Sequence, residues 1–194
     1  MMKRLLDLAV SLGAIVVLSP LLALIALAVK VTSAGPVFHR GERVGRGGAA
    51  FRILKFRTMR MNASGPGITR SGDARVTPLG RVLRRSKLDE LPQLVNVLRG
   101  EMSIVGPRPE APEYVRLYTD DERRVLTVRP GLTSPASLRY RHEESLLGGD
   151  DWHDRYVNEI MRDKLRDDLT YIDTRTFLGD LGLIARTFGS LFRP

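Results

Sequence analysis

The chain has 194 residues, enough for one domain together with a membrane element. It contains no cysteine, which excludes disulfides, thiolate metal sites and cysteine nucleophiles. The formal net charge is +9, and residues 40–85 hold twelve Lys and Arg side chains against two acidic ones. This basic block predicts an anionic partner, which can be nucleic acid, anionic lipid or a phosphorylated substrate.

The first element is an apolar segment of 22 uncharged residues, 8–29. As a helix rising about 1.5 Å per residue, it would extend about 33 Å and could cross a bilayer. A cleaved signal peptide is the weakest interpretation, because its apolar region spans only about 7–15 residues. A simple transmembrane helix and a re-entrant hairpin, which enters and leaves by the same face, both remain.

Two features favour the re-entrant hairpin slightly. Ser19 and Pro20 lie at the midpoint of the segment, where proline removes a backbone donor and kinks a helix. Lys3 and Arg4 precede the segment and Lys30 follows it, so both ends prefer the cytoplasmic side. We therefore expect a helix–break–helix membrane hairpin over residues 1–33 and a cytoplasmic domain over residues 34–194.

The next elements predict a mixed domain. Residues 37–40 and 51–56 alternate between apolar and polar side chains, which indicates a β-hairpin. Thr77 and Pro78 are typical of a helix start, and Arg84 lies on the polar face of the helix that follows. A further helix ends at Gly100. The expected fold class is α+β, mainly helical with a small β-hairpin.

The C-terminal part predicts amphipathic helices. Residues 152–166 form an acidic helical segment. An apolar stripe follows, made of Phe177, Leu178, Leu181, Ile184, Phe188, Leu191 and Phe192. The stripe fits equally well in the core or on a membrane surface.

Two adjacent carboxylates, Asp89 and Glu90, lie at a predicted helix start in residues 86–94, SKLDELPQL. Ser86 and Asp89 have the spacing of a capping box, so Asp89 can be a helix cap. Carboxylates are also competent nucleophiles in phosphoryl transfer, so Asp89 can equally be catalytic. Neighbouring helical residues point about 100° apart, which predicts different roles for Asp89 and Glu90. Downstream, Arg108 lies between two prolines, and such a rigid arginine suits phosphate binding.

Residues 86–109, SKLDELPQLVNVLRGEMSIVGPRP, closely resemble the bacterial sugar transferase family, the monotopic phosphoglycosyl transferases. Further matches are GPVF at 35–38, ERVG at 42–45, KFRTM at 55–59, RVTPLGR at 75–81 and RPGLT at 129–133. The resemblance covers nearly the whole chain, and the short chain is similar to the minimal, single-module members.

The resemblance implies transfer of a sugar 1-phosphate from a UDP-sugar to polyprenyl (undecaprenyl) phosphate, with release of UMP. Asp89 would attack the β-phosphate and form a covalent intermediate. Glu90 would either bind Mg²⁺ together with Asp89 or accept a proton. The resemblance also implies a re-entrant hairpin broken at Ser19 and Pro20, in the bacterial inner membrane with the domain on the cytoplasmic face. The anion-binding cations it implies are Lys55, Arg84, Arg108 and Arg141.

The chain departs from the commonest family pattern at residues 134–141, SPASLRYR. The assignment of Arg141 and the identity of the donor sugar both depend on this stretch. The competing hypothesis is a membrane-tethered protein that binds anionic lipid or nucleic acid without catalysis. Aromatic residues make up only 6% of the chain, which disfavours nucleic acid as a partner. Association of this chain with further copies of itself, as a homo-oligomer, is a further prediction.

Overall fold

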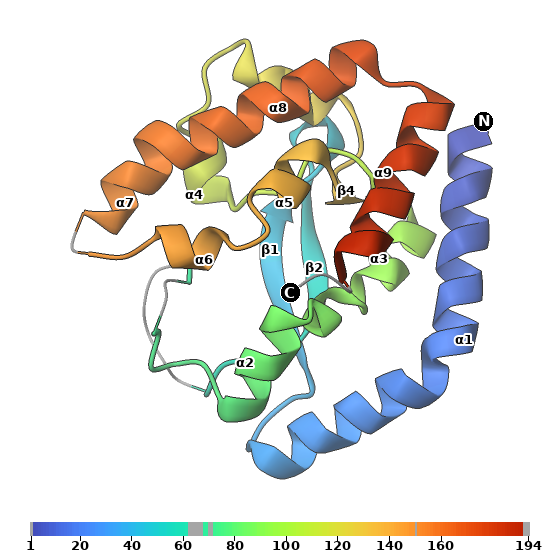
Figure 1. Cartoon of the computed structure of the whole chain (residues 1–194), viewed down its shortest axis with the longest axis vertical. Helices are drawn as coiled ribbons and strands as arrows, with labels where there is room; N and C mark the ends of the chain where they lie inside the picture. Colours follow the sequence, from blue (N-terminus) through green and yellow to red (C-terminus); the bar gives the residue numbers. More distant parts are fainter. Residues whose placement is uncertain (1, 62–67, 70–71, 150, 192–194) are drawn as a thin grey trace.

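Two small sheets lie at the centre of the fold, with helices around them (Figure 1). The computed structural model describes residues 2–61, 68–69, 72–149 and 151–191. β1 (Phe38–Val44) runs antiparallel to β2 (Ala50–Phe56), and β3 (Ser103–Val105) runs parallel to β4 (Gly131–Thr133). The described helices are α1 (Met2–Thr32), α2 (Pro78–Arg85), α3 (Gln93–Arg99), α4 (Pro112–Val115), α5 (Pro135–Arg139), α6 (Glu143–Leu146), α7 (Trp152–Arg155), α8 (Met161–Thr174) and α9 (Phe177–Leu191). The predicted α+β class with a small β-hairpin is confirmed.

Helix α1 is continuous from Met2 to Thr32 and is bent along its length (Figure 1). By its length and its composition alone, α1 could cross a membrane. Pro20 lies inside it and cannot donate to the carbonyl of Val16, four residues earlier. The Ser19 hydroxyl donates to that same carbonyl at 2.8 Å, which replaces the lost hydrogen bond. The expected break is therefore a bend in one helix, not a gap between two.

The N-terminal end of α1 is bound to the rest of the domain through polar contacts. The Arg4 guanidinium donates to the carbonyls of Val97 and Leu98, at 2.7 and 3.0 Å, and so caps the end of α3. Asp7 is buried and accepts a hydrogen bond from the Ile104 amide of β3 at 2.9 Å. These contacts fix the first two turns of α1 against α3 and β3.

The C-terminal end of α1 is bound to the same domain. The buried Arg57 donates to the carbonyls of Ser33 and Ala34, at 2.5 and 2.7 Å, just beyond the last turn. Ile25 and Val29 of α1 pack in one apolar cluster with residues of β2 and α2. Both ends of α1 therefore contact the same domain, and the bend carries the chain from one contact to the other.

Helix α2 begins as the sequence predicts. Thr77 caps it by accepting from the Gly80 amide at 2.9 Å, and Pro78 occupies the first helical position. Gly80 lies directly on the backbone of Thr58, because a Cβ at position 80 would be 2.1 Å from the Thr58 carbonyl oxygen. This close approach places the last turn of α2, which carries Arg84, beside β2 and the segment that follows it.

Gly80→Ala should therefore destabilise the protein, by about 1–3 kcal/mol from overpacking. An alanine in a helix interior normally stabilises by up to about 1 kcal/mol relative to glycine. Gly182→Ala in α9 is the matched control, because a Cβ there meets no atom within 4 Å. Thermal unfolding of both variants checks the prediction, which fails if Gly80→Ala melts at or above the wild-type temperature.

The predicted C-terminal helices are present. The segment 152–166 lies within α7, a π-helical turn (Tyr156–Ile160) and α8, which continues to Thr174. In α9, Leu183 is buried in the core, whereas Leu178 and Phe188 are 77% and 63% exposed. The residues of the predicted stripe thus lie mainly on the exposed side of α9, although Ile184 packs against the core cluster that contains Leu183. Phe192 lies outside the described residues.

Candidate active site

Asp89 and Glu90 lie in a short 3-10 turn (Leu88–Glu90) between α2 and α3. The preceding residue, Lys87, has a left-handed backbone with φ of 59°, the only positive φ at a non-glycine residue in the described chain. Such a conformation costs free energy and is commonly found at functional sites. It separates the end of α2 from the turn that carries the two carboxylates, and both of these are buried.

The capping-box interpretation of Ser86 and Asp89 is wrong. The Ser86 hydroxyl donates backwards to the carbonyls of Val82 and Leu83, at 2.9 and 3.1 Å, and so belongs to the end of α2. Helix α3 starts only at Gln93, four residues after Asp89. A carboxylate at position 89 therefore does not cap α3, and its presence needs another explanation.

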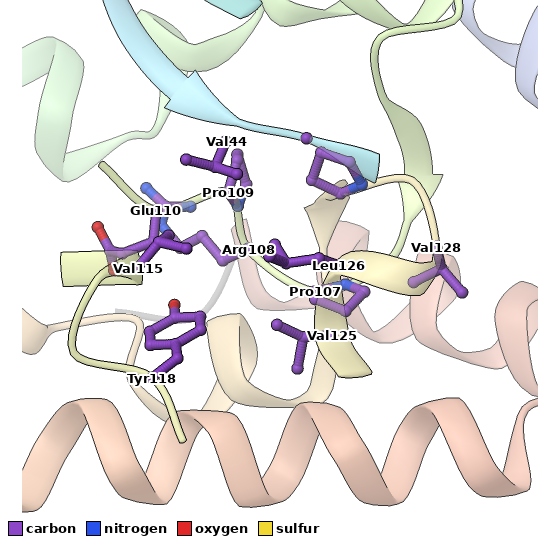
Figure 2. Close-up of a pocket in the computed structure, with 12 residues that line it drawn as sticks. Val44, Pro107, Arg108, Pro109, Glu110, Val115, Tyr118, Val125, Leu126 and Val128 are labelled. Carbon is purple, nitrogen blue, oxygen red and sulfur yellow. The ribbon is translucent and has the colours of Figure 1, made fainter. Parts of the chain in front are cut away.

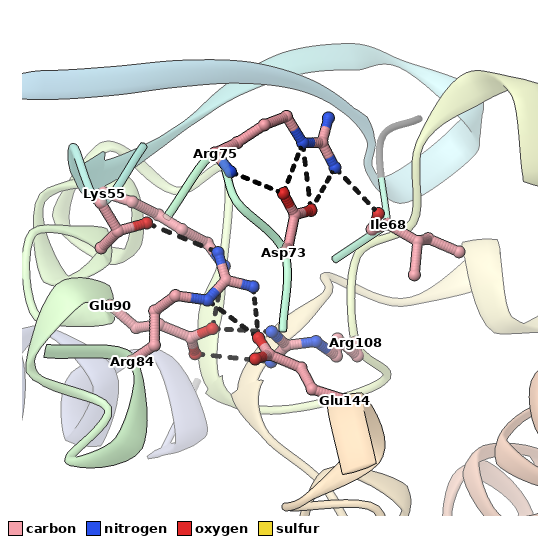
Figure 3. Close-up of polar contacts among 9 residues, drawn as sticks. Lys55, Ile68, Asp73, Arg75, Arg84, Glu90, Arg108 and Glu144 are labelled. Carbon is pink, nitrogen blue, oxygen red and sulfur yellow. Dashed lines mark hydrogen bonds and ion pairs between the residues drawn. The ribbon is translucent and has the colours of Figure 1, made fainter. Parts of the chain in front are cut away.

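Glu90, which is buried, joins two of the predicted cations, both partly buried, in one cluster (Figure 3). Its Oε1 accepts from Lys55 Nζ of β2 at 2.8 Å and from Arg108 Nη2 at 2.7 Å. Its Oε2 accepts from Arg108 Nη1 at 3.4 Å. Burial acts to raise the pKa of Glu90, but the positive charges of Arg108 and Lys55 outweigh burial and hold that pKa well below its ordinary value. Glu90 is therefore a carboxylate at neutral pH.

Asp89 lies in a different environment. Its Oδ1 is buried and accepts no hydrogen bond from any residue in the described ranges. Burial raises the pKa of Asp89 above its ordinary value, and the negative charge of Glu90 raises it further. Lys55 and Arg84 act in the opposite direction. The two neighbouring acids thus have pKa values shifted in opposite directions, an arrangement that assigns them different chemical roles.

Arg108 is held rigidly behind Glu90. Pro107 and Pro109 flank it, and Figure 2 shows this segment lining a small pocket with apolar side chains such as Val125. The Arg108 amide donates to Asp168 Oδ2 of α8 at 3.2 Å. The guanidinium therefore approaches Glu90 from a backbone fixed by two prolines and one hydrogen bond.

The other two predicted cations differ in their placement. Arg84 donates through Nε to Glu144 Oε1 at 2.8 Å and through Nη1 to the Thr58 hydroxyl at 3.4 Å. Its charge lowers the pKa of Asp89, which places it beside the cluster. Arg141 instead donates to the Ser190 carbonyl of α9. The structure therefore brings Lys55, Arg84 and Arg108 together around the two acids, and it directs Arg141 towards α9.

Sequence reasoning missed three residues of this neighbourhood. Lys87 lies two residues before Asp89, and burial lowers the pKa of its ammonium, with the charge of Arg108 acting in the same direction. Burial also raises the pKa of Asp168 to about 6. Glu144 binds Arg84 from 60 residues away in the sequence. Lys87 belongs to the SKLDELPQL motif and could have been found there, whereas Asp168 and Glu144 lie in an acidic stretch with no local signal.

Of the two predicted Mg²⁺ ligands, Asp89 fits a metal site better than Glu90 does. Within the ranges that the structure describes, no group of three or more His, Cys, Asp or Glu side chains could enclose a metal ion. Mg²⁺ commonly uses only one or two carboxylates together with substrate phosphates. Asp89 Oδ1 has no hydrogen-bond partner among the described residues and fits such a site. Glu90 fits poorly, because its Oε1 is already bound by Lys55 and Arg108.

Several cations of the basic block, residues 40–85, form ion pairs or hydrogen bonds inside the fold. Lys55 binds Glu90, Arg75 binds Asp73, and the buried Arg57 binds carbonyl oxygens. These cations are therefore not part of an open basic surface of the kind that binds nucleic acid.

Comparison with known proteins gives a consistent result. The sequence profile of the bacterial sugar transferase family matches residues 1–194. A UDP-glucose:undecaprenyl-phosphate glucose-1-phosphate transferase of Caulobacter vibrioides is 42% identical over 97% of this chain and 69% of its own length. The exopolysaccharide production protein ExoY of Sinorhizobium fredii is 36% identical over 95% of this chain and 83% of its own length.

A UDP-N-acetylgalactosamine-undecaprenyl-phosphate N-acetylgalactosaminephosphotransferase of Aeromonas hydrophila is 41% identical over 70% of this chain and 33% of its own length. The profile match spans the whole chain, and the Caulobacter and Sinorhizobium relatives cover nearly all of it. The chain therefore belongs to the bacterial sugar transferase family of enzymes.

Proposed function

We propose that this protein transfers a sugar 1-phosphate from a UDP-sugar to undecaprenyl phosphate and releases UMP, as the first membrane step in assembling a glycan. The substrates are those named for its relatives. The observation that carries the proposal is Asp89, a buried carboxylate beside a cluster of cations, whose Oδ1 has no hydrogen-bond partner among the described residues. A reactive acid beside fixed positive charges suits attack on a phosphorus atom whose oxygens those charges neutralise.

The proposed reaction has two displacements. An Asp89 carboxylate oxygen attacks the β-phosphorus of the UDP-sugar, the bond from that phosphorus to the bridging oxygen breaks, and UMP leaves. A phosphate oxygen of undecaprenyl phosphate then attacks the same phosphorus. The bond to Asp89 breaks, which regenerates the carboxylate and gives undecaprenyl-diphosphate-sugar. No proton needs to be abstracted from the acceptor phosphate once it is ionised.

Glu90 acts in this scheme as a positioning residue. It holds Lys55 and Arg108 in one place, at 2.8 and 2.7 Å, and it neutralises part of their charge before the substrate arrives. The two cations then meet the donor diphosphate without first having to be ordered. When bound, Mg²⁺ supplies further neutralisation of the diphosphate charge, with Asp89 Oδ1 as its ligand.

The structure supports the re-entrant topology through the two ends of α1. Arg4 contacts α3 at one end, and Arg57 caps the other end, so both ends meet the same domain. A helix that spans a bilayer would place its ends on opposite sides, about 30 Å apart. With Lys3, Arg4 and Lys30 at the two ends, the positive-inside bias then favours the cytoplasmic face of the inner membrane.

The donor is proposed to be the UDP derivative of a hexose or an N-acetylhexosamine. Relatives of nearly equal identity are named for UDP-glucose and for UDP-N-acetylgalactosamine. We assign the choice between them to residues 134–141, the stretch where the sequence departs from the pattern expected from the resemblance.

The test has two arms. UMP release is measured over a panel of UDP-sugars with undecaprenyl phosphate and Mg²⁺, and one donor should dominate. In the second arm, labelled UMP is incubated with that donor and no acceptor. A covalent intermediate predicts exchange of the label into the UDP-sugar and a phosphosugar adduct on the peptide that carries Asp89.

The two arms separate the reaction from its mechanism. A flat response across all donors would contradict the proposed reaction. UMP release that requires the acceptor, with no exchange and no adduct, would retain the reaction but reject the covalent intermediate.

A further inference from the structure

We propose that Glu144 occupies, in the ligand-free protein, the place of a donor phosphate group on Arg84, and that the nucleotide diphosphate displaces it on binding. This inference rests on the proposed function, because it deepens the account of the same site. It makes Glu144 a determinant of how tightly the donor binds.

The contact has the form of an arginine–phosphate contact. Arg84 donates to one oxygen, Glu144 Oε1, from both Nε, at 2.8 Å, and Nη2. A phosphate group accepts from the same edge of a guanidinium, the one that carries Nε and one Nη. Figure 3 shows Glu144 reaching Arg84 beside the Glu90–Arg108 pair. The anion that Arg84 binds in the resting protein is thus supplied by the protein itself.

Glu144 lies in a segment that bridges the site. Its neighbour Glu143 is bound by the buried Lys164 of α8, at 3.2 and 3.0 Å, and Leu147 is fully buried just beyond α6. Glu144 reaches the other way, to α2. Glu143 and Leu147 anchor the segment independently of Arg84, so the Glu144 side chain can leave Arg84 while the backbone stays in place.

The exposure of the Glu144 side chain is consistent with a contact to Arg84 that a ligand can replace. The side chain of Glu144 is 45% exposed, whereas that of Glu143 is 21% exposed. A partly exposed ion pair is weak enough to be replaced, because water screens it and solvates the carboxylate that is released. A phosphate group with greater negative charge would compete effectively for the same guanidinium.

A contact that only supports the fold makes the opposite prediction. If Glu144 merely held Arg84 in place, its loss would weaken nucleotide binding or leave it unchanged. If Glu144 competes with phosphate, its loss strengthens binding. The sign of the change in affinity therefore distinguishes the two roles.

The experiment measures the Kd of UDP, which carries both donor phosphates and no sugar, by calorimetry on the full-length protein in detergent. Glu144→Gln should bind UDP about two- to five-fold more tightly, the range expected for releasing a partly exposed ion pair. Glu143→Gln is the matched control, since it removes the same charge from the adjacent residue without contacting Arg84, and its amide oxygen can still accept from Lys164 and keep the segment anchored. Its Kd should stay within about twofold of wild type. In an Arg84→Gln background, Glu144→Gln should no longer tighten binding.

Each outcome decides the matter. Tighter binding in Glu144→Gln alone, lost in the Arg84→Gln background, supports the inference. Equal or weaker binding in Glu144→Gln overturns it while leaving the proposed function intact. An equal gain in Glu143→Gln also overturns it, because the effect would then be general electrostatics. No UDP binding by any variant, wild type included, would reject the proposed function itself.

Discussion

Replacing Asp89 with asparagine is expected to abolish turnover and, at the same time, to raise the melting temperature. The loss of turnover should exceed about a thousandfold, because asparagine cannot form the acyl phosphate. The stabilisation follows from burial. The wild-type protein keeps a carboxylate in a place where burial raises its pKa and its Oδ1 accepts no hydrogen bond from the described residues. A neutral amide of the same shape removes that cost.

The pH dependence of this stabilisation follows from the direction in which the pKa of Asp89 is shifted. An acid whose pKa is higher in the folded than in the unfolded state loses stability as the pH rises from its unfolded pKa through its folded pKa. Below the unfolded value of about 3.9 both states are protonated and the cost vanishes. The gain in melting temperature of Asp89→Asn should therefore be full at neutral pH and disappear in acid.

The measurement is thermal unfolding of both proteins across this pH range, together with UMP release. For a protein of this size, 1 kcal/mol corresponds to about 2–4 °C. A melting temperature lowered at neutral pH would mean that Asp89 has a structural role, and substantial turnover in the variant would remove it as the nucleophile.

The same pH shift should be visible in the enzyme's kinetics. A nucleophilic carboxylate must be ionised, so the acid limb of kcat/KM reports the Asp89 pKa in the free enzyme. Because burial raises that pKa, the limb should lie above the ordinary pKa of aspartate. An acid limb at or below about 3.9 would indicate that Asp89 does not titrate in this step.

Elements set by local chemistry were predictable from the sequence. Thr77 followed by Pro78 carries its own cap and N1 residue, so the start of α2 could be placed to the residue. The β-hairpin was predictable for the same reason, although β1 extends to Val44, beyond the predicted stretch. In these elements the interactions that decide the structure lie within a few residues of each other.

The electrostatics of the site were not predictable in this way. The opposite pKa shifts of Asp89 and Glu90 depend on Arg108, 18 residues from Glu90, and on Lys55, 35 residues away from it. The sequence places these groups only through the motif resemblance, and it does not reveal which acid each cation binds. The error over the Ser86 capping box has a similar origin. The left-handed backbone of Lys87 separates Ser86 from the helix it was expected to cap.

Glu90→Gln should have the opposite effect on stability from Asp89→Asn, although the two changes remove the same charge at adjacent positions. The variant leaves Lys55 and Arg108 without their shared carboxylate, and breaking a buried pair from one side is strongly destabilising. Because the two cations keep side-chain exposures of 19% and 29%, we expect about 2 kcal/mol, below the 3–5 kcal/mol of a fully buried pair. Turnover should also fall by at least about tenfold, since the cations lose their fixed position.

The loss of stability in Glu90→Gln depends on pH through a pKa shift in the opposite direction. The folded pKa of Glu90 lies below its unfolded value, so its contribution is complete above about 4.3 and is lost as the pH falls through the folded pKa. The deficit of Glu90→Gln should therefore be largest at neutral pH and shrink in acid, where the wild type loses the same interaction. The double variant Glu90→Gln/Arg108→Met is the control: it should recover part of the melting temperature and none of the turnover. If Glu90→Gln instead melts at or above the wild-type temperature, Glu90 does not hold the cation cluster together, and the division of roles between the two acids must be rejected.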